Sequence, residues 1–130
     1  GKDALINGIS GNNKRYGDRE WLGFSGEDIE ITIEFNKPTN INSIATRFFN
    51  GNGQWIYPPK KVTVYINNDI RTYVADVSST NDLTAKFAVK FESTTVTSIR
   101  LKIPSYGIIP EGKQGAGHKP WTFIDEIIIK

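Results

Sequence analysis

The segment from Asp28 to Phe35 alternates strictly between polar and apolar residues, and this period of two constrains the fold more than any other feature of the chain. Its apolar positions are Ile29, Ile31, Ile33 and Phe35, and the positions between them are polar. Successive side chains of a β-strand point to opposite faces of the sheet. The pattern therefore predicts a strand with one buried face and one solvated face.

Several other segments are rich in apolar and β-branched residues, and most of them alternate in the same way: 41–49, 62–66, 72–77, 85–91, 96–103 and 124–129. Asn, Gly, Asp and Pro separate them and indicate turns. No window carries a sustained helical period. Many short strands with regular turns predict an all-β antiparallel sandwich or jelly roll. Its expected core includes Ile31, Ile33, Val64, Leu101 and Ile127.

Length and composition restrict the class of protein. A chain of 130 residues is expected to form one domain, and the absence of cysteine excludes disulfides and thiolate metal sites. Basic and acidic residues number 16 and 14 and are interspersed, which predicts no nucleic-acid partner. No apolar run approaches the ~20 residues of a membrane span. Because the chain starts at Gly1 and contains no methionine, we expect a module excised from a larger chain, and a mature chain after signal cleavage is the alternative.

Three long connections, 8–24, 50–61 and 104–121, contain all three tryptophans and the only histidine. Loops of this length in a small domain are usually functional or disordered, and this aromatic content favours order. Trp21 precedes Leu-Gly-Phe and Trp121 precedes Thr-Phe-Ile, and both tryptophans are expected to cap the core. Trp55 follows a Gly-Asn-Gly-Gln apex, where an indole can stack on a sugar ring, although the Ile-Tyr-Pro-Pro after it would also suit a turn tucked onto the sandwich.

Polar side chains near these loops are candidates for binding sugar hydroxyls beside Trp55. We select Arg47, Tyr16 and His118 as its partners in a predicted ligand site at the loop end of the sandwich. The alternative for each of them is an ordinary solvated surface residue.

Catalytic motifs are missing from the sequence. There is no Gly-x-Ser-x-Gly, no His-Glu-x-x-His, no phosphate-binding glycine loop and no cysteine nucleophile. Asp125 and Glu126 are adjacent, so as strand residues they would point to opposite faces and could not flank one glycosidic bond. The sequence therefore predicts a protein that is not an enzyme.

Four blocks occur in a fixed order along the chain: Trp21–Asp28, Trp55–Pro58, Gly115–Gly117 and Trp121–Ile127. With them, the chain from Ala4 to Ile129 resembles the discoidin-like family, also called factor V/VIII type C. It is most similar to the C-terminal module of bacterial family 20 β-N-acetylhexosaminidases, including chitobiases. The resemblance implies a single galactose-binding-like domain over residues 1–130, an antiparallel jelly-roll β-sandwich of about eight strands.

The resemblance also implies a function. It predicts a non-catalytic carbohydrate-binding accessory module of a secreted glycoside hydrolase, located in the periplasm, on the cell surface or outside the cell. The expected partners of this monomer are a glycan containing N-acetylhexosamine or galactose and the parent catalytic domain. Two alternatives are a structural module that packs on the catalytic domain without binding sugar and a protein or cell-surface adhesion domain. The loop tips at 51–53 and 112–114 are polar, which disfavours membrane insertion.

Many sugar-binding relatives hold a structural calcium ion, and the resemblance implies one here. Its ligands would be Asn7 and Glu126, with backbone carbonyls near Ala4 and Asn12, because calcium prefers oxygen ligands. Asn7 stands where the family usually has aspartate. In the alternative, Asn7 and Gly8 form a tight turn and Glu126 accepts hydrogen bonds from loop amides.

Overall fold

The computed structural model describes residues 3–9, 14–16, 22–79, 83–125 and 127–130. These residues form strands and one short 3-10 helix, η1 (Asn52–Gln54), and none of their helices has the length and apolarity needed to cross a bilayer. The strands are β1 (Asp3–Ile9), β2 (Lys14–Tyr16), β3 (Leu22–Ser25), β4 (Ile29–Phe49), β5 (Lys61–Ile66), β6 (Arg71–Asp76), β7 (Ser78–Ser79), β8 (Thr84–Ile103), β9 (Trp121–Ile124) and β10 (Ile127–Ile129). The predicted all-β class is confirmed, with ten strands where about eight were expected.

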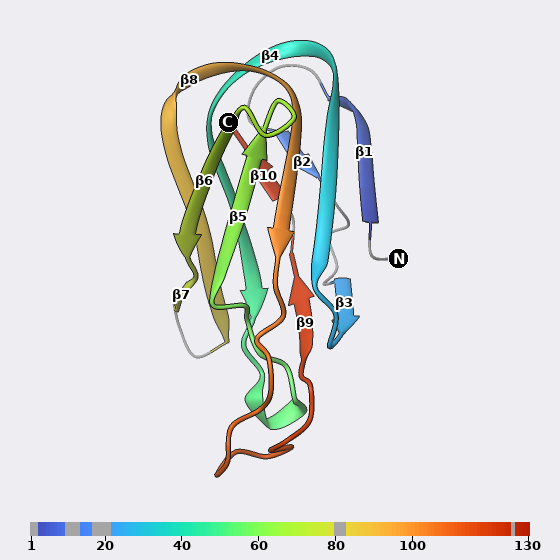
Figure 1. Ribbon diagram of the computed structural model, residues 1–130, viewed down its shortest axis with the longest axis vertical. Coiled ribbons are helices and arrows are strands. Elements are labelled where there is room, and N and C mark those ends of the chain that lie inside the picture. The colour runs from blue at the N-terminus through green and yellow to red at the C-terminus, as the bar shows by residue number, and fades with distance from the viewer. Residues whose placement is uncertain (1–2, 10–13, 17–21, 80–82, 126) are drawn as a thin grey trace.

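A long antiparallel ribbon of β4 and β8 forms the frame of the molecule and folds over at its top (Figure 1). The sequence predicts a break in each of these strands, at 36–38 and near 92–95, but both remain paired through the bend. Register shifts between residues 34 and 39 and between 41 and 43 accommodate it. Such bulges bend a ribbon without ending it, and they also admit Pro38, which cannot donate a ladder hydrogen bond.

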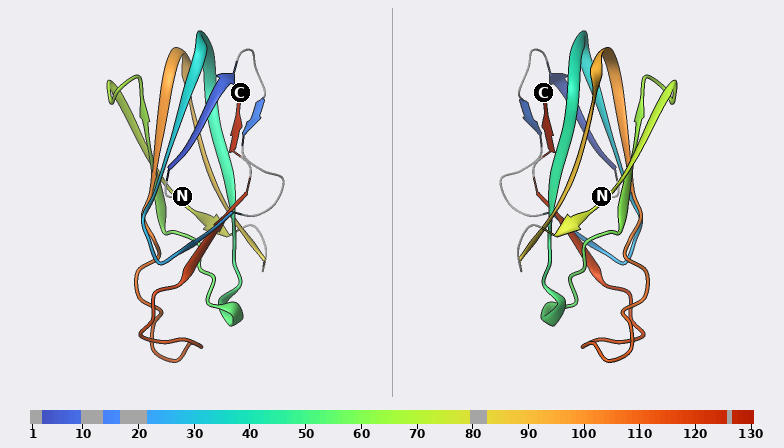
Figure 2. Two further views of the ribbon diagram at one scale, coloured as in Figure 1. Left: turned by 90° about the vertical axis from the view of Figure 1, so that its right-hand side faces the viewer. Right: turned by 90° about the vertical axis from the view of Figure 1, so that its left-hand side faces the viewer.

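Folding of this ribbon produces two facing layers (Figure 2). In the first layer, the early half of β4 pairs with β1, and the late half of β8 pairs with β5, which pairs with β6. In the second layer, the late half of β4 pairs with β10 and the early half of β8 pairs with β7, while β2 extends the layer beyond β10. All of these pairings are antiparallel except that of β1 with β4, which is parallel.

The two layers enclose one apolar core. All five residues predicted for it are buried: Ile31, Ile33, Val64, Leu101 and Ile127. Phe48 and Phe87, both fully buried, fill the space between the layers. Burial of a large aliphatic or aromatic side chain contributes about 1.5–3 kcal/mol, so this core dominates the stability of the fold.

Arg100 on β8 lies on the outer face of the first layer between two carboxylates. It donates to both oxygens of Asp69 at 2.9 Å and to Glu30 at 3.1 Å, and its guanidinium lies 4.1 Å from the ring centre of Tyr65. The hydrogen bond to Asp69 is the main reason that the pKa of Arg100 is raised above its ordinary value. The positive charge of Arg100 is therefore neutralised within the protein.

Candidate functional site

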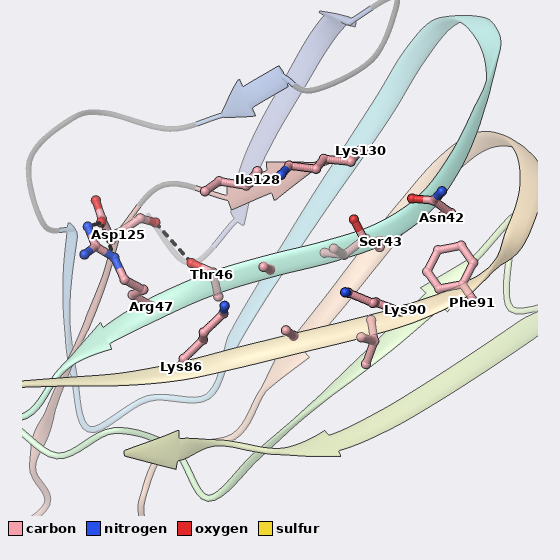
Figure 3. A pocket seen from close by; sticks show the side chains of 14 residues that line it. Asn42, Ser43, Thr46, Arg47, Lys86, Lys90, Phe91, Asp125, Ile128 and Lys130 are labelled. Atoms are coloured by element: carbon pink, nitrogen blue, oxygen red, sulfur yellow. Dashed lines mark hydrogen bonds and ion pairs between the residues drawn. The ribbon is translucent and has the colours of Figure 1, made fainter. Parts of the chain in front are cut away.

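An open groove of about 830 Å³ runs along the outer face of the second layer (Figure 3). Its lining comes from β4, β8 and β10 and from the two residues that flank β10: Asn42, Ser43, Ile44, Ala45, Thr46, Arg47, Lys86, Ala88, Val89, Lys90, Phe91, Asp125, Ile128 and Lys130. Pockets that bind small ligands usually have volumes of about 300–1,000 Å³, so the groove has the size of a binding site.

Strand register explains why this face is hollow. Ala45 on β4 lies opposite Ala88 on β8 and also pairs with Ile128 on β10. Residues two apart on a strand point to the same side, so the neighbouring outward positions carry longer side chains: Ser43 opposite Lys90, and Arg47 opposite Lys86. Two small alanines between longer side chains produce a shallow apolar floor with polar ends.

Arg47 and Asp125 form one end of the groove. The Asp125 amide donates to the Arg47 carbonyl at 3.0 Å, and the hydroxyl of Thr46 donates to the Asp125 carbonyl at 3.4 Å. Arg47 Nε donates to Asp125 Oδ2 at 3.1 Å, and Nη2 donates to the same oxygen. The Arg47 side chain remains 57% exposed. Asp125 thus fixes the direction of a guanidinium that still faces solvent.

The other end of the groove contains Asn42, Ser43, Lys90, Phe91 and Lys130 (Figure 3). The backbones of Ser43 and Lys130 exchange two hydrogen bonds of 3.1 Å, which hold the end of the chain against β4. The ring of Phe91 stacks on Tyr73 at 4.8 Å, so its orientation is also fixed.

A separate aromatic cluster joins the two long loops at the opposite end from the bend. The rings of Trp55 and His118 stack with their centres 4.8 Å apart, and the Trp55 carbonyl accepts a 2.7 Å hydrogen bond from the Trp121 amide. A Cβ atom on Gly115 would lie 2.5 Å from the indole, so the ring packs closely on that backbone. Trp55 is half-buried and connects the loops.

Replacement of Gly115 with alanine should therefore displace the Trp55 ring. The φ of Gly115 is +83°, so the variant carries a backbone cost of about 1–3 kcal/mol in addition to the clash. Gly117→Ala is the matched control, because its φ is +87° and nothing lies within 4 Å of the added carbon. Urea unfolding should show a larger loss of stability for Gly115→Ala, and equal losses would contradict this packing.

The structure unites only part of the predicted ligand site. It places Trp55 and His118 in contact with each other, while Arg47 lines the groove, whose lining includes neither of them. Tyr16 lies in β2, where its backbone pairs with Ile127, and its side chain is outside the described part of the structure.

The prediction that Trp121 caps the core is wrong, because its side chain is 42% exposed. Alternation along β9 turns Thr122 and Ile124 inward, which leaves Trp121 on the solvent side beside Phe123. Trp21, the other predicted cap, lies outside the described residues.

The calcium prediction falls mostly outside the described residues. Ala4 and Asn7 lie in β1, where only the backbone is described, and Asn12 and Glu126 are not described. In the described part of the chain, no three His, Cys, Asp or Glu side chains are grouped so that they could hold a metal ion. The calcium site stays a prediction.

No protein-family model and no curated protein matches the chain. Among solved structures, it is similar to CsCBM6-3 from Clostridium stercorarium in complex with cellobiose, with 14% identity over 92% of this chain and 87% of that one and a TM-score of 0.41. It is also similar to a carbohydrate-binding module from Cellvibrio mixtus lichenase 5A in complex with cellotriose, with 14% identity over 85% and 69% of the two chains and a TM-score of 0.35.

A third similar structure is lmo2446 from Listeria monocytogenes, in complex with glucose, magnesium and calcium. The identity is 14% and the TM-score 0.44, and the match covers 92% of this chain but 11% of that one. All these TM-scores are below 0.5, so the function proposed below rests on the residues of this chain.

Proposed function

We propose that this chain is a non-catalytic carbohydrate-binding module, and the groove on the second layer carries the proposal. Sugars present apolar C–H faces and many hydroxyls. The floor of Ala45, Ala88 and Ile128 suits the apolar faces, while the longer side chains at both ends supply hydrogen-bonding groups. A groove on the outer face of a sheet admits part of a longer glycan, as well as a free end.

The absence of a catalytic role is proposed on the chemistry of the same groove. Hydrolysis of a glycosidic bond needs two carboxyl groups that flank the bond. Asp125 is the only carboxylate among the described residues that line the groove, and it is bonded to Arg47. The groove is thus equipped to hold a glycan and not to cleave it.

The resemblance to discoidin-like modules of family 20 hexosaminidases supports a role as an accessory module of a secreted glycoside hydrolase. The module would keep its parent catalytic domain on a substrate containing N-acetylhexosamine or galactose. Tethering of this kind raises the effective concentration of the second partner without any new contact.

A glycan array probed with the isolated domain tests this proposal. On binding, sugar hydroxyls give up hydrogen bonds with water for hydrogen bonds with the protein, so we expect saturable binding with a Kd between micromolar and millimolar, or about 4–8 kcal/mol. Retention of no glycan at millimolar concentration would reject the proposal.

A structural module is the second candidate function. The observation that favours it is the exposed Trp121, whose ring lies 5.9 Å from that of Phe123 and offers an apolar surface to a neighbouring domain. Trp121→Ser would then weaken association with the parent catalytic domain while glycan binding stayed absent.

Calcium, if it is bound by Asn7 and Glu126, should stabilise the native state by mass action. At a hundredfold excess over its Kd, the gain is about 2.7 kcal/mol. We expect a higher melting temperature in millimolar calcium than in chelator and no such difference for Glu126→Gln. Identical melting temperatures of the parent domain in calcium and in chelator would reject the calcium site.

A further inference from the structure

Within the described part of the chain, four basic side chains and one acidic side chain line the groove. The basic residues are Arg47, Lys86, Lys90 and Lys130, and the acidic residue is Asp125. The whole chain has a net charge of only +2, with 16 basic and 14 acidic residues. The fold therefore concentrates positive charge on this face, although the sequence distributes it evenly.

On the outer face of the first layer, the one arginine of β8 is paired differently. There Arg100 contacts two carboxylates, Asp69 and Glu30. In the groove, Asp125 pairs with Arg47, and among the described residues no carboxylate lies within ion-pair distance of Lys86, Lys90 or Lys130. Clustered like charges repel one another and raise the local positive potential, and a bound anion relieves that repulsion.

The hydrogen-bonding chemistry of the groove points in the same direction. Lysine and arginine side chains are donors only, so a ligand rich in acceptors fits them. Among the described residues of the lining, Phe91 is the one aromatic residue, and its ring stacks on Tyr73. None of these described lining residues is a tryptophan or tyrosine on which a neutral sugar ring could stack.

We propose that the groove selects acidic oligosaccharides, whose negative groups are carboxylates or sulfates, over neutral ones. Arg47 and Lys86 would bind a negative group at one end, and Lys90 with Lys130 would bind a second group at the other end. The pair Arg47–Lys86 and the pair Ser43–Lys90 lie four residues apart along the strands, or about 13 Å at ~3.3 Å per residue. This spacing exceeds one sugar ring and requires an oligosaccharide. The inference rests on the proposed function and specifies its ligand.

A single-stranded nucleic acid is the competing polyanion. Proteins that bind single strands stack successive bases on aromatic side chains, and among the lining residues that the structure describes only Phe91 could serve that purpose. An oligosaccharide lies along the small floor of Ala45 and Ala88 without such a platform. The chemistry of the floor therefore favours the glycan.

The test is calorimetric titration of the domain with a tetrasaccharide of uronic acid and with the methyl ester of the same tetrasaccharide. The two ligands differ in charge and share one backbone. A sulfated oligosaccharide and a single-stranded oligonucleotide complete the series. We expect at least one acidic glycan to bind ten or more times tighter than the ester. A rise from 20 to 200 mM salt should reduce this difference in affinity, because salt screens the charges.

The double variant Lys86→Gln, Lys90→Gln should lose at least tenfold in affinity for the acidic glycan and a smaller factor for the ester, because glutamine keeps a hydrogen-bonding group and loses the charge. Lys102→Gln is the matched control, since Lys102 is an exposed lysine of the same strand in the first layer. An equal loss in the control would overturn the inference.

The remaining outcomes separate the inference from the proposed function. Equal affinity for acid and ester would overturn the inference and leave carbohydrate binding in place. If neither the acid nor the ester binds, both the inference and the proposed function are rejected. Tighter binding of the oligonucleotide than of any glycan would replace the inference and the proposed function with nucleic-acid recognition. A preference for uronate or for sulfate supports the inference and identifies the negative group.

Discussion

Ile33→Asp should unfold the protein. Ile33 is fully buried in β4, where it pairs with Ile99 of β8 and with Ile6 of β1. An unpaired carboxylate at this position costs several kcal/mol, and the total stability of a domain is only about 5–15 kcal/mol. Circular dichroism should show loss of the cooperative thermal transition.

Thr32→Asp is the control for this variant. It introduces the same charge one residue earlier, on the opposite face of β4, where position 32 lies across from Arg100. This variant should melt cooperatively and close to the parent domain. An Ile33→Asp variant that melted within a few degrees of the parent would show that the two layers do not enclose this residue.

Ala88→Trp should abolish glycan binding and preserve the fold. Ala88 is exposed on the groove floor, directly opposite Ala45, where the Cβ atoms of facing residues are about 4.5–5.5 Å apart. An indole at this position fills the floor without entering the core. Titration with the best glycan from the array should show a loss of at least tenfold, about 1.4 kcal/mol.

Val74→Trp provides the comparison for that variant, because Val74 is 57% exposed on β6 in the other layer. It adds the same side chain to an exposed strand position away from the groove and should leave affinity unchanged. If Ala88→Trp retains the parent affinity while Val74→Trp loses it, the binding surface lies on the first layer.

The sequence predicts strands and core well, because the period of two reports directly which side of a strand is buried. Ile31 and Ile33 are assigned to the core on this basis, and both are buried. The same rule, applied to β9, would have placed Trp121 outward. The prediction failed there because it followed from the Thr-Phe-Ile after Trp121 and not from the position of Trp121 in the alternation.

The pairing and register of neighbouring strands could not be predicted from the sequence. The alternation of the predicted strands places three basic residues at outward positions and therefore predicts that they are exposed: Arg47, Lys86 and Lys90. Their convergence on one groove depends on the register between β4 and β8, and that register is set by the bulged bend near Pro38. Alternation within one strand carries no information about its partner.

The loop aromatics illustrate the same difficulty. Trp55 and His118 are both in predicted long loops, and their rings stack on each other, while their role in binding a ligand stays a prediction. Their contact with each other, and the packing of the indole on Gly115, depend on how the two loops meet. An indole face that stacks on His118 is not available to a sugar, which moves the proposed site from the loops to the sheet.

The most direct measurement of the central claim is a titration of the ¹⁵N-labelled domain, followed by amide chemical shifts, with the glycan that binds best on the array. Carbohydrate binding in the groove predicts that the shifts concentrate at residues 42–47, 86–91 and 127–130. Shifts confined to residues 51–57 and 112–121, or no shifts at millimolar glycan, would contradict it.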